Sequence, residues 1–234
     1  MKLAIMQPYF FPYIGYFQLI HAVDKIIFYD DVNFIKKGWI NRNNILINSS
    51  AFLFSIPCKN ISQNSLINEV ELIFDTNEKE RFLKRIELAY KKSKEFDNFF
   101  PVLKNFILND SSKIISELAI NSILMVCDYL KIDLNFDLSS RIHSDSSTLA
   151  KEKRIQHIVL KEEADVYVNP IGGKALYHKE NFENLGLKLQ FLESDNIKYK
   201  QYNTSFVPWL SILDVLMFND VKETNKFIRQ YHLT

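Results

Sequence analysis

The hydrophobic positions near the start of the chain form two short apolar runs with a helix-like stretch between them. LAIMQ at 3–7 and KIIFYDD at 25–31 have the composition of buried strands, and FQLIHAV at 17–23 has that of a short helix. Because a strand, a helix and a second strand in this order favour parallel pairing, these residues predict a β-α-β unit.

The same order returns near the C-terminus. Helical KEKRIQHIVLKE precedes the apolar run ADVYVNP, and LYHKENFENL precedes GLKLQFLE. Two earlier stretches, AFLFSIPC and EVELIF, also have strand composition. We therefore expect an α/β fold: an open, mostly parallel, Rossmann-like sheet flanked by helices. Ligands of such sheets lie beyond the carboxyl ends of the strands, where we expect Gln7, Asp30 and Asn169.

The middle of the chain contains no glycine and has helical spacing. Residues 77–92 place apolar side chains on one face, with glutamates in the first turn and lysines in the last, which suits the helix dipole. A second helix is expected to begin after Ser111 or Ser112 as its N-cap. We expect a single α/β domain over residues 1–234, with a mainly helical section around 77–132 that is either part of the main domain or an inserted lobe.

The C-terminal stretch FVPWLSILDVLMF predicts a packing helix with Pro208 near its first turn. Asp214 lies among the apolar residues of this helix, so its carboxylate needs a partner if it is buried. We expect a structural ion pair there rather than a catalytic group.

Charge and composition narrow the classes of partner. The 234 residues include 29 basic and 28 acidic side chains, and 47% are hydrophobic. This composition is typical of a globular protein and does not favour a nucleic-acid partner. The apolar run at 3–6 is too short for a signal sequence, and no segment has the length of a membrane span. The sequence therefore predicts a cytoplasmic protein.

The cysteines and histidines are not spaced as metal ligands. Cys58 and Cys127 lie far apart in the sequence, so we expect two free structural thiols. His21, His143 and His157 have no partner at metal-ligand spacing, and no metal site is assigned.

The loop QPYFFPYIGY at 7–16 combines two prolines, a glycine and several aromatic rings. The prolines fix the backbone, and Gly15 lets the backbone approach a ligand where a helix begins and its free N–H groups can bind an anion. Gln7, Tyr9, Gly15 and Tyr16 are therefore candidate substrate-binding residues. The alternative is that the rings only close the end of the sheet.

A polar cluster follows the apolar run at 25–31. Paired carboxylates at a strand end bind Mg²⁺ or take a proton from an amine. Arginine grips carboxylates and phosphates, and tryptophan stacks on a base or a sugar. The candidate catalytic residues are Asp31, Lys37 and Arg42, and the candidate binding residues are Asp30, Trp39 and Asn41. The alternative is a turn with solvated charges.

Ser139 and Ser140 are further candidate substrate-binding residues. With Arg141 they resemble the Ser-Ser-Arg element of pantothenate synthetases, which form an acyl-adenylate and then an amide. The alternative is a helix cap followed by an exposed basic face that includes Arg154.

In NPIGGKALYHKENF, Gly172 and Tyr177 are also candidate substrate-binding residues. The two adjacent glycines would let the backbone approach a substrate group. A Gly-Gly pair is, however, often only a turn.

The opening stretch QPYFFPYIGYFQLIHAVDKIIFYDDVNFIKKGWINRNNI and the later SFVPWLSILDVLMFN resemble the WbqC-like protein family, known mainly from bacterial surface-polysaccharide gene clusters. The resemblance spans nearly the whole chain. It implies a role in O-antigen production, with transfer of an amino acid such as glycine onto an amino sugar. The chain departs from the family at FNDVKE, where the family tends to have glycine after the asparagine.

The loop also resembles the strand, loop and helix of nucleotidyl-transferring α/β enzymes, in which a His-x-Gly-His element binds ATP phosphates. Tyr13-Ile14-Gly15-Tyr16 occupies the analogous spacing, but both histidines are missing. Tyrosine hydroxyls donate hydrogen bonds without carrying positive charge, so adenylyl transfer by that element is not implied.

The residues and the resemblance together lead to an enzyme of O-antigen and lipopolysaccharide biosynthesis, a transferase that attaches an acyl group, glycine or another amino acid, to a nucleotide-linked amino sugar. Its substrates would be that sugar and an activated acyl donor. The sequence names no cofactor; ATP and Mg²⁺ are candidates. The alternatives are a non-catalytic nucleotide-sugar-binding module and a metal-dependent glycosyltransferase.

Within the transferase hypothesis, Asp31 is the base or the Mg²⁺ ligand, and Lys37 and Arg42 grip a phosphate or carboxylate. We expect Asp31→Ala or Arg42→Ala to abolish turnover and to leave the melting temperature within a few degrees. The oligomeric state is not predicted.

Overall fold

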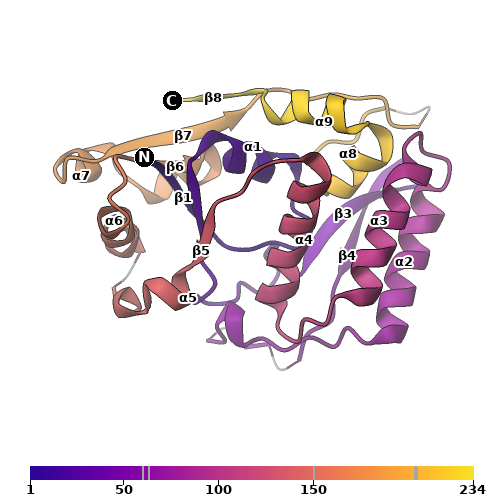
Figure 1. The fold of residues 1–234 in the computed structure, drawn as a ribbon, viewed down its shortest axis with the longest axis horizontal. Coiled ribbons are helices and arrows are strands. Elements are labelled where there is room, and N and C mark those ends of the chain that lie inside the picture. The colour runs from indigo at the N-terminus through magenta and orange to yellow at the C-terminus, as the bar shows by residue number, and fades with distance from the viewer. Residues whose placement is uncertain (60, 63, 150, 203–204) are drawn as a thin grey trace.

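The computed structural model describes residues 1–59, 61–62, 64–149, 151–202 and 205–234, and its centre is a six-stranded sheet in the order β5-β2-β1-β6-β7-β8 (Figure 1). All neighbouring strands pair in parallel except β8, which is antiparallel to β7. The strands are β1 Lys2–Met6, β2 Lys25–Phe28, β5 Phe136–Leu138, β6 Val166–Pro170, β7 Lys188–Ser194 and β8 Tyr231–Leu233. The prediction of a mostly parallel, Rossmann-like sheet is confirmed, and its strand order is that of a doubly wound dinucleotide-binding sheet.

Helices cover both faces of this sheet. Alternate residues of β1 face opposite ways, so Leu3 and Ile5 pack against the helices of one layer, while Ala4 faces the other layer. The first layer contains α6 Lys151–Lys161 and α7 Lys179–Glu183. The second contains α1 Ile14–Ala22, α4 Ile115–Leu130, α8 Ile212–Phe218 and α9 Val221–Ile228. A short helix, α5 Ser139–Ile142, directly follows β5.

The section between β2 and β5 contains a two-stranded hairpin and three helices. The hairpin consists of β3 Arg42–Ile47 and β4 Ser50–Ser55, and the helices are α2 Thr76–Tyr90, α3 Phe96–Asn109 and α4. The strand expected in AFLFSIPC is confirmed. EVELIF forms only isolated bridges, in which Leu72 pairs with Cys58 and Glu71 with Ile114, so the regular strand expected there was wrong.

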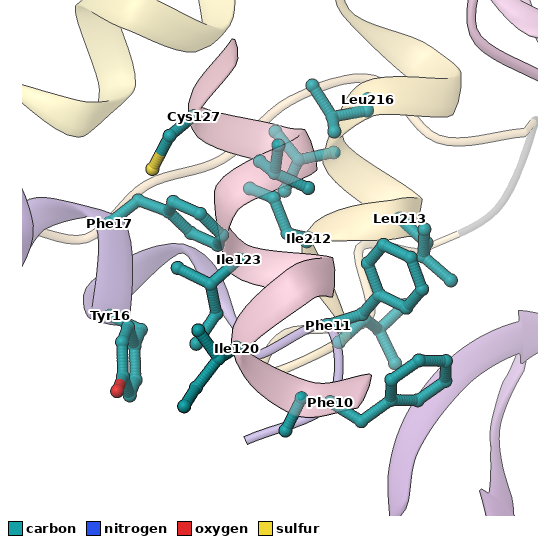
Figure 2. Close-up of a cluster of buried hydrophobic side chains, with 14 of the residues drawn as sticks. Phe10, Phe11, Tyr16, Phe17, Ile120, Ile123, Cys127, Ile212, Leu213 and Leu216 are labelled. Atoms are coloured by element: carbon teal, nitrogen blue, oxygen red, sulfur yellow. The ribbon is translucent and has the colours of Figure 1, made fainter. Parts of the chain in front are cut away.

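Part of the aromatic loop at 7–16 is buried in the hydrophobic core. Phe10 and Phe11 are completely buried between the sheet and the helical section, beside α4 and α8 (Figure 2). The Phe11 carbonyl accepts hydrogen bonds from Asn43 Nδ2 at 2.6 Å and from Ser211 Oγ at 2.8 Å, and its amide donates to Ser122 Oγ at 3.1 Å. These two rings therefore fix the loop, while the tyrosines on either side of them remain only partly buried.

Two helices begin later than predicted. The first residue of α4 is Ile115, because Glu117 caps the preceding backbone by accepting from the amides of Lys113 and Ile114 at 3.1 and 3.3 Å. Similarly, α8 begins after Ser211, whose hydroxyl accepts from the amide of Leu213 at 3.2 Å. Pro208 consequently lies before the helix rather than in its first turn.

Asp214 in α8 is fully buried, but its partners are neutral. Its carboxylate accepts hydrogen bonds from the hydroxyls of Tyr90 and Tyr199 at 2.8 and 2.5 Å and from Gln201 Nε2 at 2.9 Å. The expected ion pair was wrong. Burial raises the pKa of Asp214, and the three donors oppose that effect.

Within the ranges that the structure describes, no helix combines the length and the apolar character needed to cross a membrane. Cys58 and Cys127 are free thiols, and burial raises the pKa of each to about 12.

Candidate functional site

The two carboxylates after β2 meet the two serines after β5. Asp30 is buried, and its Oδ1 accepts from the Ser140 amide at 3.0 Å and lies 3.1 Å from Ser139 Oγ. Its Oδ2 accepts from Ser140 Oγ at 2.6 Å. Because β2 and β5 are parallel neighbours, their carboxyl ends lie side by side and bring these residues together. Two pairs of candidate residues, Asp30 with Asp31 and Ser139 with Ser140, therefore form one cluster although the pairs are more than 100 positions apart in the sequence.

Asp31 extends this cluster to α6. Its Oδ2 forms an ion pair with an Arg154 guanidinium nitrogen at 2.5 Å, and its Oδ1 accepts from Ser139 Oγ at 2.5 Å. The Arg154 guanidinium carbon also lies 4.7 Å from the centre of the Tyr29 ring, and Nε donates to Ser146 Oγ at 3.2 Å. Arg154 is buried, so its assignment to an exposed basic face was wrong.

The positions of the apolar residues in α6 could have predicted that Arg154 lies in the interior. Arg154 shares the inward face of the helix with Ile155, Ile158 and Val159, all of which are buried. An arginine on an apolar face requires an acidic partner, and Asp31 supplies it.

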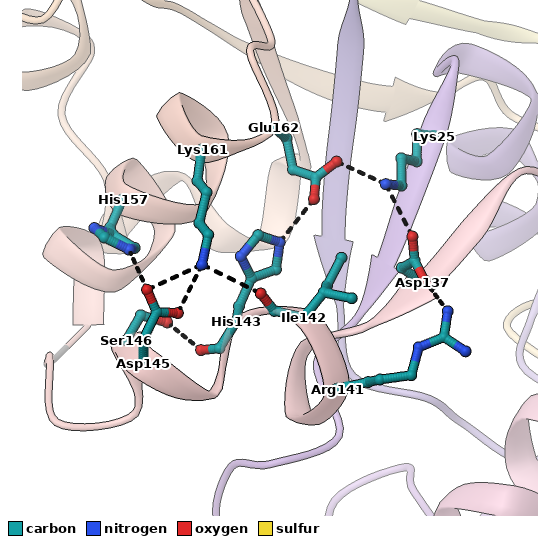
Figure 3. A network of polar contacts seen from close by, with 10 residues as sticks. All are labelled: Lys25, Asp137, Arg141, Ile142, His143, Asp145, Ser146, His157, Lys161 and Glu162. Atoms are coloured by element: carbon teal, nitrogen blue, oxygen red, sulfur yellow. Dashed lines mark hydrogen bonds and ion pairs between the residues drawn. The ribbon is translucent and has the colours of Figure 1, made fainter.

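A second polar network fixes the other end of α6 to the sheet. Lys25 Nζ in β2 lies 2.7 Å from Glu162 Oε2 and 3.0 Å from Asp137 Oδ2 in β5, and His143 Nε2 lies 2.8 Å from Glu162 Oε1 (Figure 3). Lys161 contacts Asp145 at 3.0 Å. With α6 held at its C-terminal end in this way, Arg154 is positioned at the Asp31 carboxylate.

The strand order reverses between β1 and β6, where an open α/β sheet usually binds its ligand. Gln7 follows β1 there, and Asn169 lies near the end of β6.

Asn169 Oδ1 accepts from the Tyr167 hydroxyl at 3.0 Å, and a side chain at Gly173 would clash with Asn169 Nδ2. The ring of Tyr177 packs edge-on against that of Tyr167, with 5.7 Å between centres. Gly172 is exposed and has open space beside it.

The tyrosines of the aromatic loop differ in what they contact. Tyr16 is buried and donates to the Gln7 carbonyl at 3.0 Å, so its hydroxyl positions the loop. The Tyr9 ring lies 5.9 Å from that of Tyr16, and burial raises the pKa of Tyr9 to about 12, which keeps its hydroxyl protonated. At Gly15, the close neighbour is the ring of Tyr13, which lies where a side chain would begin. The ligand roles of these residues remain predictions.

The other half of the predicted polar cluster lies along the hairpin. Arg42 Nε donates to the Gly38 carbonyl at 2.7 Å, another of its nitrogens contacts the Lys37 carbonyl, and its guanidinium carbon lies 5.6 Å from the Trp39 ring centre. Asn41 Nδ2 donates to the Ile56 carbonyl at 2.8 Å. Within the described part of the chain, no hydrogen bond or ion pair joins Asp31 to Lys37 or Arg42.

The hydrogen bonds and the ion pair of Asp30 and Asp31 do not favour metal binding by these carboxylates. Both carboxylates are occupied by hydroxyl, amide and guanidinium donors, so Mg²⁺ would first have to displace Arg154 or the serines. A hollow of about 700 Å³ opens beside Asp30, between the end of β5, the segment at 109–113 and α4.

Comparison with known proteins gives one family and one relative. The model of the WbqC-like protein family matches residues 7–226. The chain is 28% identical over 232 residues to "Uncharacterized protein Rv1507c" of Mycobacterium tuberculosis (strain ATCC 25618 / H37Rv), and the alignment covers 97% of both chains. No solved structure matches.

Proposed function

This chain belongs to the WbqC-like protein family, and from that premise we propose that it is a transferase of surface-glycan biosynthesis that joins an activated acyl group, such as glycine, to the amino group of a nucleotide-linked amino sugar. The supporting observation is the contact of Asp31 with Ser139 and Arg154 at the carboxyl ends of β2 and β5. Arg154 and Ser139 orient this carboxylate, and the hollow of about 700 Å³ opens beside the neighbouring Asp30, on the edge of the sheet where α/β enzymes bind small molecules.

Amide formation requires one proton transfer at this carboxylate. The amine nitrogen attacks the acyl carbon, the bond from that carbon to its leaving group breaks, and the nitrogen loses a proton. Asp31 accepts that proton at a lone pair that its hydrogen bonds with Arg154 and Ser139 leave free, and these two partners keep the carboxylate oriented. The Tyr9 hydroxyl, which stays protonated, donates a hydrogen bond to the substrate.

The test is an assay of amide formation with nucleotide-linked amino sugars and two kinds of donor, pre-activated aminoacyl compounds and free amino acids with ATP. Mass spectrometry would detect the acylated sugar. Asp31→Asn should lower kcat by about 100-fold or more, because the amide side chain cannot take a proton. Asp133→Asn, at an exposed carboxylate before β5, is the matched control and should keep wild-type turnover.

The alternatives give different results in the same assay. Transfer of the sugar itself to an acceptor, without an amide, would replace the proposal with a glycosyltransferase. Saturable binding of the nucleotide-sugar with no product from any donor would identify a binding module.

A further inference from the structure

A second hollow lies beside the end of β7, which is separated in the sheet from β2 and Asp31 by β1 and β6. It has a volume of about 250 Å³ and opens where β7 ends and α1 begins, between those elements and the segment that precedes α8. Its walls include four aromatic side chains, Tyr13, Tyr199, Phe206 and Trp209, and its rim carries Asp195 and Asn196. The hollow therefore combines flat apolar walls with a polar edge, at the carboxyl end of a parallel strand.

Trp209 is the most exposed large apolar side chain described in the protein, with 72% of its surface accessible. Its ring centre lies 5.9 Å from that of Tyr13. Its backbone has φ of +61°, a conformation that side-chain-bearing residues rarely adopt. Neither burial nor backbone preference accounts for an indole at this position, because the ring gains little from burial and the backbone is strained.

We propose that this hollow binds the nucleobase of a nucleotide ligand, which stacks on the exposed face of Trp209. A nucleobase is planar and aromatic with hydrogen-bonding groups at its edge, which matches aromatic walls beside a carboxylate and an amide. The proposal rests on the proposed function in taking the substrate to be nucleotide-linked. It adds the place where the base is held and the residue that holds it.

The two tryptophans of the chain make this measurable by fluorescence. Trp209→Phe removes one of the two indoles and leaves Trp39. Titration of the wild type with ADP, UDP, GDP and CDP should quench the fluorescence in a saturable manner for at least one of the four, and Trp209→Phe should lose that quenching. Inorganic pyrophosphate and free glucosamine carry the phosphate and sugar chemistry without a base, and should produce no saturable change. Absence of quenching by all four nucleotides, or equal quenching by pyrophosphate or glucosamine, would overturn the proposal.

Substitution of Trp209 separates binding from folding. Trp209→Gly removes the ring at a position whose positive φ suits glycine, so its melting temperature should equal or exceed that of the wild type. Its affinity for the quenching nucleotide, measured by calorimetry, should fall by about 5- to 140-fold, the value of one stacked base. Trp209→Phe, which keeps a ring, should retain more of the affinity than Trp209→Gly. Leu176→Ala, at another exposed apolar side chain, should bind as the wild type does. Unchanged affinity in Trp209→Gly would refute the role of the ring.

Failure of this proposal is distinct from failure of the proposed function. Nucleotide binding that depends on Trp209, without amide formation, would leave the pocket assignment intact and reject the acyl transfer. Amide formation with an unchanged KM for the nucleotide-sugar in Trp209→Gly would support the acyl transfer and reject the pocket assignment.

Discussion

Asp31 and Arg154 carry opposite charges in a place that is nearly closed to water, with 9% and 3% of their side chains accessible. Such a pair is stabilised by mutual attraction and by the hydrogen bonds around it. Removal of one partner leaves an uncompensated charge in the interior. The structure therefore predicts a loss of stability in Asp31→Ala, whereas the sequence predicted a melting temperature within a few degrees of the wild type.

Asp31→Ala should lower the free energy of unfolding by about 3–5 kcal/mol, since Arg154 loses its partner. Urea denaturation would measure this loss. Asp145→Ala is the control, because Asp145 pairs with Lys161 on the surface, where water screens the pair, and its removal should lower stability much less. Equal losses of unfolding free energy in the two variants would show that the Asp31–Arg154 pair contributes no more than a surface ion pair.

His143 gives a prediction for pH. Its ring is buried, and burial lowers its pKa, although the nearby Glu162 and Asp145 oppose that shift and Lys161 adds to it. The unfolded chain therefore takes up a proton at this imidazole below about pH 6.5, and the folded protein does so only at a lower pH. His143 consequently leaves the free energy of unfolding unchanged above that pH and lowers it increasingly as the pH falls below it.

Urea midpoints of the wild type and of His143→Gln, measured from pH 8 to pH 5, would check this. The wild type should lose stability below about pH 6.5 more steeply than the variant does. His178→Gln, which changes an exposed imidazole, should reproduce the wild-type profile. A parallel decline in the wild type and His143→Gln would assign the pH dependence to other groups.

Single residues also show how far the sequence could predict the site. Asp30 and Asp31 were recognisable because they follow a short apolar run, and Ser139 and Ser140 because they resemble a known Ser-Ser-Arg element. The parallel pairing of β2 with β5 that brings them together was not predicted. Lys37 and Arg42 belong to the same sequence cluster, but the Arg42 guanidinium binds the backbone carbonyls of Lys37 and Gly38. Nearness in sequence does not determine the direction of a side chain after a turn.

At the scale of elements, the β3–β4 hairpin has a tight two-residue turn. Ile47 pairs with Ser50, and the turn residues Asn48 and Ser49 have φ of +49° and +61°. Positive φ at both central positions defines a type I′ turn, for which Asn-Gly is the preferred sequence. Serine at the second position is therefore strained.

Ser49→Gly should raise the free energy of unfolding by about 0.5–1 kcal/mol, because glycine accepts the positive φ without a steric penalty. Denaturant titration is again the measurement. Ser50→Gly, one residue later and within β4, should instead lower stability by about the same amount. The same sign of change in both variants would show that the turn conformation carries no strain.

Elements with a strong local pattern were predictable, and those that depend on distant partners were not. The helix predicted at 77–92 exists as Thr76–Tyr90, because its apolar stripe and its Asp75 N-cap are both local features. β3 was missed because its sequence RNNILI begins with polar residues that point to the loop. EVELIF has strand composition but no continuous partner, so it pairs only at isolated bridges.

For the whole molecule, one hydrophobic core joins the sheet to the helical section. Ala4 and Ile26 of the sheet belong to the same buried cluster as Phe82 in α2 and Phe99 in α3. The ring of Phe10 links the parts directly, with centres 5.7 Å from Phe82 and 6.3 Å from Phe54. We therefore propose that the helical section and the sheet form one domain, rather than a domain with a separate lobe.

If so, both parts should unfold in one transition. Trp39→Phe leaves the indole at the end of the sheet, and Trp209→Phe leaves the one beside the hairpin. The urea midpoint of each variant, measured by fluorescence, should coincide with its own midpoint from far-ultraviolet circular dichroism. Two separate midpoints would mean that the helical section is an independent lobe.

The position of β1 in the middle of the sheet has a consequence for synthesis of the protein. β1 precedes the other strands of this sheet in the chain, and its pairing with β2 is complete by residue 28. Its other neighbour pairs Leu3 with Tyr167, which leaves the ribosome about 160 residues later. At about 5–20 residues per second, one hydrogen-bonding edge of the first strand waits on the order of 10–30 s for its partner. The nascent chain thus carries an open strand edge while about 160 residues are translated, and the second half of the sheet forms only after β6 has been made.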